Sequence, residues 1–425
     1  MRLGRRWLAP LAVLAAGTLT LAACGAQQSA GEQAKAPPGV TDNQITIGGT
    51  MPMSGSASVY YSVGKGANAY FQYVNSQGGV NGRQIKYNIL DDAYTPSQTP
   101  AKARQLVEQD KVFLTFSDLG TPPNIAVRDY YNAQKVPQLF VATGADTWGT
   151  DYKKYPWTLG WQPSYVTEGK IYAKHILQSE PNDKIGVLYQ NDDYGQDYLH
   201  GLQQGLGSKA SSMIVAQTTY NANDPVDMSS QVNRLKASGA DTFYVAATPN
   251  YAANAGVNAV KSGWKPRIYM NNVAGATSTW RAVVQQLGSS AGIDGMVSTV
   301  YVKDPLDTAR CGNDKGVQLF RDVMSKYGNG CDPSGADAYC VTGFAAAYTM
   351  ADVLRKAGKD LTRQKVMDLA ASNLNETDNP MLVPGTVVRT TKNDHHPIQQ
   401  EQLQRWAGDH WAPFGQVIDV RSPTG

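Results

Sequence analysis

The chain contains 425 residues, of which 42% are hydrophobic and 17% charged, and its formal net charge is +3. This length exceeds what one hydrophobic core usually supports, so we expect two lobes. The composition excludes an intrinsically disordered chain, and the small net charge excludes a basic nucleic-acid-binding surface.

Residues 1–23 have the layout of a secretory signal peptide. A positive stretch precedes an apolar run, Trp7 to Ala23, that is too short for a comfortable transmembrane helix. The positive charges are Arg2, Arg5 and Arg6. Arg5-Arg6 leaves a twin-arginine export route open, although the flanking residues fit it poorly. Removal of this segment lowers the formal charge from +3 to 0, so we expect no attraction to nucleic acid or to an anionic membrane surface.

The segment Leu21-Ala22-Ala23-Cys24-Gly25 resembles a bacterial lipobox, in which the cysteine is acylated and becomes the mature N-terminus. An ordinary signal peptide with an incidental cysteine is the alternative. Residues 24–41 are predicted to be a lipidated flexible linker, because Gly25 to Gly39 is poor in large apolar residues. Such a coil spans roughly 20–25 Å.

From Gln44 onward, short apolar segments alternate with amphipathic ones, which predicts doubly wound parallel α/β sheets. The predicted strands are Ile45–Gly48, Gln84–Leu90, Val112–Phe116, Gln138–Val141, Ile185–Tyr189, Met213–Ala216, Thr242–Ala246 and Arg267–Met270. The predicted helices are Gly64–Ser76, Ala101–Gln109, Ile125–Ala133, Glu168–Leu177, Asp197–Leu206, Met228–Ala237 and Ala252–Lys261. Sheets of this type bind ligands outside the carboxyl ends of their strands.

Past residue 300 the pattern changes to helices between Lys315 and Ala371. Three late strands follow, and Gly408-Asp409 makes a plausible hairpin turn between the last two. These strands are Val387–Arg389, Gln402–Trp406 and Trp411–Phe414.

An ordered set of short motifs resembles the leucine/isoleucine/valine-type periplasmic binding proteins, over nearly the whole chain from Gln44 to Arg421. The motifs are Met53-Ser54-Gly55, Asn75-Ser76-Gln77-Gly78-Gly79-Val80-Asn81-Gly82, Asp91-Asp92, Leu119-Gly120-Thr121 and Asp193-Tyr194-Gly195. The resemblance implies the type I periplasmic binding fold, with two Rossmann-like lobes joined by a three-strand hinge. The crossings are expected near Gly160–Pro163, Ser298–Val302 and Met381–Gly385. Residues 42–161 and 300–382 would form lobe 1, and residues 162–299 and 383–421 would form lobe 2.

The resemblance also implies ligand-binding residues in the first lobe. Thr121 takes the position whose hydroxyl grips a ligand carboxylate, helped by the backbone of Gly120 just before a helix expected near Asn124. Backbone N–H groups at a helix start would complete this cradle. The alternative is that Thr121 only caps that helix. Further contacts are expected from Tyr60 and from the loop Ala142, Thr143 and Gly144.

In the second lobe the resemblance implies contacts from Tyr194, Thr248 and Asn272. Asn271-Asn272 stands where the family places its ammonium-binding acid, and an ammonium buried without an acidic partner is costly. Asp118, Asp192 or Asp193 could substitute from nearby loops. We therefore expect a small carboxylate, amide or aromatic ligand, with leucine or valine as a lesser alternative. The expected aromatic wall is Tyr60, Trp148, Trp161 and Tyr194.

Catalytic and metal motifs are out of place, so we expect neither an enzyme nor a bound metal or cofactor. Gly288-Ser289-Ser290-Ala291-Gly292 matches a hydrolase nucleophile elbow, which needs a strand before it and a helix after it. Here Trp280–Leu287 is helical and Gly295–Val300 is extended, so the order is reversed. His395-His396 lies in a polar loop and is expected to be a solvated turn. No phosphate-binding loop occurs, so nucleotide hydrolysis belongs to another subunit.

Three cysteines remain if Cys24 carries lipid. A helix near Asn313–Tyr327 would separate Cys311 from Cys331 by about 20 Å, beyond disulfide reach. We therefore favour a Cys331–Cys340 disulfide, with three buried free thiols as the alternative.

These features predict a monomeric solute-binding lipoprotein on the outer face of the cytoplasmic membrane. Its partners would be a small-molecule ligand, the permease subunits of an ABC importer and the membrane through the lipid. A ligand-sensing receptor subunit of the same fold is the alternative.

Overall fold

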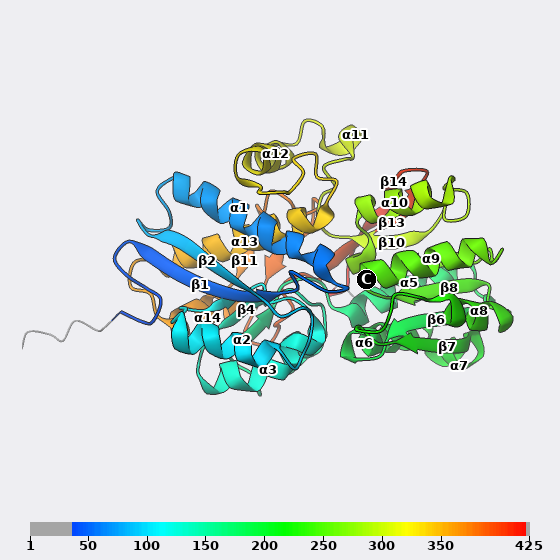
Figure 1. The fold of residues 1–425 in the computed structure, drawn as a ribbon, viewed down its shortest axis with the longest axis horizontal. Helices are drawn as coiled ribbons and strands as arrows, with labels where there is room; N and C mark the ends of the chain where they lie inside the picture. Colours follow the sequence, from blue (N-terminus) through cyan, green and yellow to red (C-terminus); the bar gives the residue numbers. More distant parts are fainter. Residues whose placement is uncertain (1–35, 422–425) are drawn as a thin grey trace, which may run out of the picture. The chain divides into compact units, whose positions relative to one another are not determined.

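The computed structural model describes residues 36–421 (Figure 1). The predicted signal peptide, Cys24 and most of the predicted linker lie outside the described residues. Within residues 36–421, no helix combines the length and apolar character needed to cross a membrane.

The first sheet has five parallel strands in the order β2-β1-β3-β4-β5. The central strand β1 is buried along almost its whole length, because helices cover both faces of the sheet (Figure 1). The strands are β1 (Gln44–Met51), β2 (Gln84–Asp91), β3 (Thr115–Phe116), β4 (Gln138–Val141) and β5 (Thr158–Gly160). The helices of this stretch are the 3₁₀ turn Ser58–Tyr60, α1 (Tyr61–Ser76), α2 (Thr99–Arg104) with a π-helical end Gln105–Gln109, α3 (Thr121–Ala133) and α4 (Thr147–Thr150).

Residues after the second crossing add further helices to this lobe. Helix α13 (Ala338–Ala357) approaches α1 closely because both helices carry a glycine at the contact. A Cβ on Gly343 would lie 1.9 Å from the carbonyl oxygen of Val63, and one on Gly66 would lie 2.0 Å from that of Cys340. The added elements are α11 (Thr308–Cys311), α12 (Lys315–Tyr327), α13 (Ala338–Ala357), α14 (Arg363–Ser372), β11 (Asn375–Glu376) and β12 (Val388–Arg389).

The second sheet has seven strands in the order β14-β13-β10-β9-β8-β6-β7. Five strands are parallel, and the hairpin β13–β14 adds two antiparallel ones next to β10. The strands are β6 (Ile185–Gln190), β7 (Ile214–Tyr220), β8 (Thr242–Ala246), β9 (Arg267–Met270), β10 (Val297–Val300), β13 (Gln400–Ala407) and β14 (His410–Asp419). The helices are α5 (Tyr165–Ser179), α6 (Asp193–Leu206), the 3₁₀ turn Gly207–Lys209, α7 (Ala210–Met213), α8 (Ser229–Ala237), α9 (Pro249–Lys261), the 3₁₀ turn Asn272–Ala274 and α10 (Thr277–Leu287).

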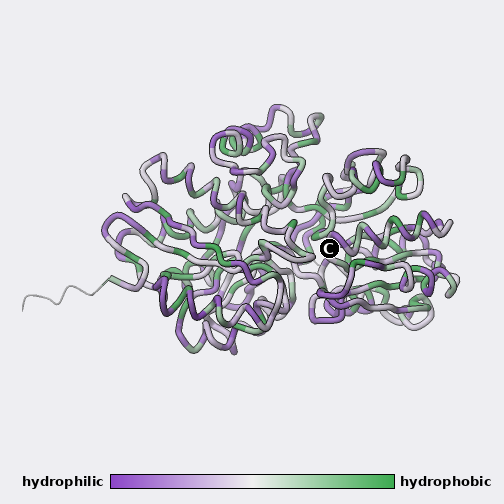
Figure 2. The backbone as a smooth tube through the Cα atoms, in the orientation of Figure 1, coloured by the Kyte–Doolittle hydropathy of each residue, from purple (hydrophilic) through white to green (hydrophobic). Residues whose placement is uncertain are grey.

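The predicted two-lobe α/β class and the late hairpin are therefore confirmed. Figure 2 shows hydrophobic stretches on the central strands of the sheets. Two local predictions were imprecise. Residues 112–114 are buried but only Thr115–Phe116 pair as β3, and Met213 ends a helical turn before β7 begins.

The second and third crossings run side by side. Val302 and Leu382 form an antiparallel bridge, and the backbone N–H of Val383 donates to the carbonyl of Tyr301 at 2.9 Å. Val388 and Ile398 still pack in the core of the first lobe, and the chain joins the second sheet at Gln400. The sequence analysis had placed all of residues 383–421 in the second lobe, whereas Val388 and Ile398 pack in the first lobe and only the chain from Gln400 joins the second sheet.

Candidate functional site

A cavity of about 100 Å³ lies between the two lobes. Its first wall comes from the loops after β1, β3 and β4, and its second wall from the loops after β8 and β9. The second crossing, from Val300 to Asp304, lines one side. The cavity thus lies at the carboxyl ends of parallel strands, where open α/β sheets bind ligands.

Seven of the nine residues predicted to bind ligand line this cavity. They are Tyr60, Gly120, Thr121, Ala142, Tyr194, Thr248 and Asn272. Thr143 and Gly144 lie behind them. The hydroxyl oxygens of Thr143 and Thr121 are 2.6 Å apart, and the backbone N–H of Ala145 donates to the Thr143 hydroxyl at 3.1 Å. A Cβ on Gly144 would meet the carbonyl oxygen of Pro163 at 2.3 Å, so this glycine permits close approach to the first crossing.

The structure contradicts the capping alternative for Thr121, whereas its predicted contact with a ligand stays a prediction, since Thr121 lines the cavity. Helix α3 begins at Thr121 itself, and the N-cap is Gly120, whose φ of +98° suits glycine. The Thr121 hydroxyl therefore pairs with Thr143 and does not cap the helix. Pro122 and Pro123 follow at once and have no N–H, so the helix start offers fewer backbone donors than the predicted carboxylate cradle.

Tyrosines dominate the cavity wall. Tyr60, Tyr94, Tyr165, Tyr194, Tyr301 and Tyr339 all line it. Burial raises the pKa of each of these phenols, so they are neutral hydrogen-bonding groups at physiological pH. Four of the six were missed by sequence reasoning, because tyrosine is equally common in packed cores and nothing in the local pattern marked them.

The two tryptophans expected in the wall lie elsewhere. Trp161 donates its indole N–H to the Thr349 hydroxyl at 3.1 Å, inside the first lobe. Trp148 lies against the guanidinium of Arg128, 4.7 Å from its ring centre. Both are buried, and neither lines the cavity.

An acidic residue does reach the cavity, although not one that was proposed from the sequence. Asp304 accepts from the Thr277 hydroxyl at 3.1 Å and from the backbone N–H of Leu306 at 2.8 Å, and burial raises its pKa. The adjacent Lys303 is paired with Asp314 at 2.8 Å. The signal for Asp304 was its place just after the predicted second crossing.

The acids named from the sequence have other roles. Asp118 accepts from the backbone N–H of Thr50 at 2.8 Å, and burial raises its pKa to about 6. Asp192 caps helix α6 through the N–H groups of Tyr194 and Gly195. Asp193 is the first residue of α6, and none of the three acids lines the cavity.

Asn272 and Asn271 are held by hydrogen bonds. The Asn272 backbone N–H donates to buried Glu168 at 2.7 Å, and its side-chain amide donates to the carbonyl of Thr299 at 2.5 Å. The Asn271 amide donates to the hydroxyl of Tyr194 at 2.6 Å. These bonds hold in place Asn272 and Tyr194, which both line the cavity.

Direct hydrogen bonds join the lobes around the cavity. The hydroxyls of Tyr60 and Tyr339 both donate to the carbonyl of Val273, at 3.0 and 3.1 Å. Ser56 donates to the carbonyl of Ala222 at 2.8 Å, and Asn250 donates to the carbonyl of Ser56 at 2.6 Å. The described residues therefore form a closed arrangement of the two lobes.

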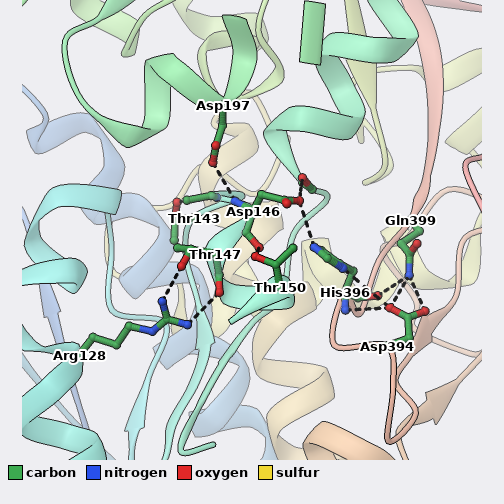
Figure 3. A network of polar contacts seen from close by, with 11 residues as sticks. Arg128, Thr143, Asp146, Thr147, Thr150, Asp197, Asp394, His396 and Gln399 are labelled. Atoms are coloured by element: carbon green, nitrogen blue, oxygen red, sulfur yellow. Dashed lines mark hydrogen bonds and ion pairs between the residues drawn. The ribbon is translucent and has the colours of Figure 1, made fainter. Parts of the chain in front are cut away.

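A polar network near the first crossing links four separate segments through Asp146 (Figure 3). Its carboxylate accepts from the Ser164 hydroxyl at 2.6 Å and lies 3.1 Å from Nε2 of His396, while its backbone N–H donates to Asp197 at 2.8 Å. Burial alone would raise the pKa of Asp146, but His396 and Ser164 hold it below its ordinary value. Burial raises the pKa of Asp197 to about 7.

His396 therefore does not form the solvated turn expected from the sequence, and its neighbour His395 is buried and stacks on Tyr152 with ring centres 4.1 Å apart. The sequence predicted a solvated loop because the partners of these histidines, Asp146 and Tyr152, are distant in sequence. Ser289 and Ser290 lie between α10 and β10, the reverse of a nucleophile elbow. Residues 36–421 contain no group of three side chains suited to hold a metal ion.

Cys331 and Cys340 form a disulfide with a Cα–Cα distance of 6.0 Å, and Cys311 is buried as a free thiol. This is the pairing that the sequence analysis favoured. The bridge ties the loop after α12 to the start of α13, next to the cavity residue Tyr339.

Comparison with known proteins places these features in a family. Residues 44–410 match the sequence pattern of the family described as "Periplasmic binding protein". The Leu/Ile/Val-binding protein homolog 3 of Brucella melitensis is 25% identical over 204 residues, which is 47% of this chain and 53% of that protein. The chain thus matches about half the length of this relative.

Two solved structures share the fold. The branched chain amino acid ABC transporter protein from Thermus thermophilus with bound valine superposes with a TM-score of 0.75 at 15% identity, covering 90% of this chain and 98% of that one. The solute binding protein from R. palustris in complex with benzoate gives a TM-score of 0.72 at 16% identity, covering 88% and 96%.

Proposed function

Because the chain belongs to the periplasmic binding protein family, we propose that it is an exported solute-binding lipoprotein that captures a small molecule and delivers it to an ABC importer. The family consists of solute-binding proteins and implies export. The proposal adds the lipid anchor at Cys24, the attachment to the outer face of the membrane, the monomeric state and the importer as partner.

The observation that carries the proposal is the cavity with walls from both lobes. A molecule inside it is contacted from both sides only when the lobes are closed. Its binding energy therefore shifts the protein toward the closed arrangement. We propose that residues 42–161 and 300–399 move as one body against residues 162–299 and 400–421, because Val388 and Ile398 pack in the core of the first lobe and β13 begins at Gln400.

The cavity suits a small carboxylate, amide or aromatic compound. About 100 Å³ is somewhat less than the roughly 150 Å³ cavity that holds benzene in an engineered protein. Phenol hydroxyls and Thr121 supply neutral hydrogen bonds, and the tyrosine rings supply apolar surface. Asp304 keeps an amino acid with a free ammonium group as a second candidate.

A thermal-shift screen of amino acids, amides, aromatic acids and short polyols tests this proposal. A ligand at a hundred times its dissociation constant adds about 2.7 kcal/mol to the stability, which is an easily measured shift. Solution scattering with the best ligand is expected to show a smaller radius of gyration. An unchanged radius with a saturating ligand would contradict closure of the lobes.

Deletion of the gene separates transport from sensing. A receptor for an importer is needed for uptake of its ligand, whereas a sensor subunit leaves uptake intact and alters only the response. Unchanged uptake of the identified ligand in the deletion strain favours the sensor.

A further inference from the structure

A second cavity of about 270 Å³ adjoins the interlobe cavity on the hinge side. The two cavities share six lining residues, Val300, Val302, Lys303, Asp304, Gln404 and Trp411. Beyond them the second cavity is bounded by Cys311, Val383, Pro384, Pro413 and Val417 and by the polar residues Arg310, Asp314 and Gln402, and it ends near exposed Arg310 and Pro384. Its wall is mainly apolar and reaches the protein surface between the crossing strands and the hairpin β13–β14.

We propose that the two cavities form one binding site for an N-acylated amino acid, with the polar head between the lobes and the acyl chain in the hinge-side cavity. This inference rests on the proposed function, because it assigns the ligand class of the same site. An acyl chain that leaves through the hinge side lets the lobes close around the head.

The junction between the cavities offers hydrogen-bond acceptors for the amide N–H of such a ligand. Gln404 is only 4% exposed and lines both cavities. Its amide nitrogen donates to the carbonyl of Thr299 at 3.1 Å, which leaves its side-chain carbonyl oxygen without a protein partner within residues 36–421. The Asp304 carboxylate lies at the same junction. This oxygen faces accessible space, so a ligand N–H at the junction can donate to it.

The two ends of the ligand meet different surfaces. The head carboxylate has neutral donors in the interlobe cavity, namely the Thr121 hydroxyl and the phenols of Tyr194 and Tyr301. The acyl chain passes Trp411 and Val302 to reach Val417.

Isothermal titration with four probes tests the inference: valine, N-acetylvaline, N-octanoylvaline and octanoate. Each methylene buried by the longer acyl chain contributes roughly fourfold in affinity, so N-octanoylvaline is expected to bind at least tenfold more tightly than N-acetylvaline. Octanoate alone, which lacks the amide N–H, is expected to bind at least tenfold more weakly than N-octanoylvaline.

A filling variant separates the hinge-side cavity from the interlobe cavity. Val417→Phe narrows the second cavity and not the interlobe cavity, so it is expected to abolish the gain in affinity from the octanoyl chain and leave N-acetylvaline within twofold of wild type. Val215→Phe is the matched control, since Val215 is 38% exposed on β7 and lines neither cavity. It is expected to bind all probes like wild type.

Three results would overturn the inference. Equal affinity for N-octanoylvaline and N-acetylvaline would mean that the six shared residues form a closed wall between the cavities. A gain in affinity from the octanoyl chain that survives in Val417→Phe would place the chain elsewhere. Failure of every acylated probe to bind would reject the ligand class, while stabilisation and closure by another compound in the screen would leave the receptor function standing.

Discussion

The Val273 carbonyl gives the sharpest test of lobe closure, because two tyrosines of the opposite wall donate to it. Removing one hydroxyl with Tyr60→Phe or Tyr339→Phe deletes a hydrogen bond but leaves the carbonyl paired with the other tyrosine. Each single change is expected to weaken binding of the ligand found in the thermal-shift screen by about 0.5–1.5 kcal/mol, or roughly twofold to thirteenfold.

The double variant is expected to cost more than the sum of the single ones. It leaves the Val273 carbonyl without either tyrosine in the closed form, which adds about 1–3 kcal/mol of desolvation. Isothermal titration of wild type and the three variants gives the coupling energy. Tyr130→Phe is the control, because its hydroxyl binds Glu108 within the first lobe and is expected to leave affinity unchanged. Additive losses, or no loss at all, would refute the view that this carbonyl joins the lobes in the ligand-bound state.

Three further predictions concern the hinge, the anchor and the disulfide. Burial raises the pKa of Asp197 to about 7, above its value in the unfolded chain. Ionisation of Asp197 therefore destabilises the folded state, and the free energy of unfolding falls as the pH rises from about 4 through 7. Asp197→Asn is therefore expected to match wild type in urea unfolding at pH 4 and to be more stable by a few kcal/mol at pH 8; an equal difference at both pH values would contradict this. Cys24→Ser is expected to release the protein from the membrane fraction or stop its processing, because the acyl chains hold it there, and wild-type fractionation and maturation would reject the lipid anchor. Cys331→Ser is expected to lower the free energy of unfolding by about 2–3 kcal/mol, as for a short closed loop, whereas peptide mapping that links Cys311 to another cysteine would show a different pairing.

Much of the fold follows from local pattern. Alternating apolar strands and amphipathic helices such as Gln84–Leu90 and Gly64–Ser76 are signals of short range, and the structure places β2 and α1 over them. The turn at Gly408-Asp409 is similarly local, and β13 and β14 pair across it. The sequence missed the true start of α3, although Thr121-Pro122-Pro123 already carried the signal, because proline is favoured in the first turn of a helix.

The sequence by itself determined the α/β alternation, the family resemblance and the loops that follow each parallel strand, because these depend on neighbouring residues and on strand direction. Only the tertiary structure decided which side chains share the cavity. Tyr94, Tyr301, Tyr339 and Asp304 join it from segments far apart in the chain, and His396 reaches Asp146 across 250 positions. No local pattern encodes such contacts, since they exist only once the crossings bring the lobes and the hinge together.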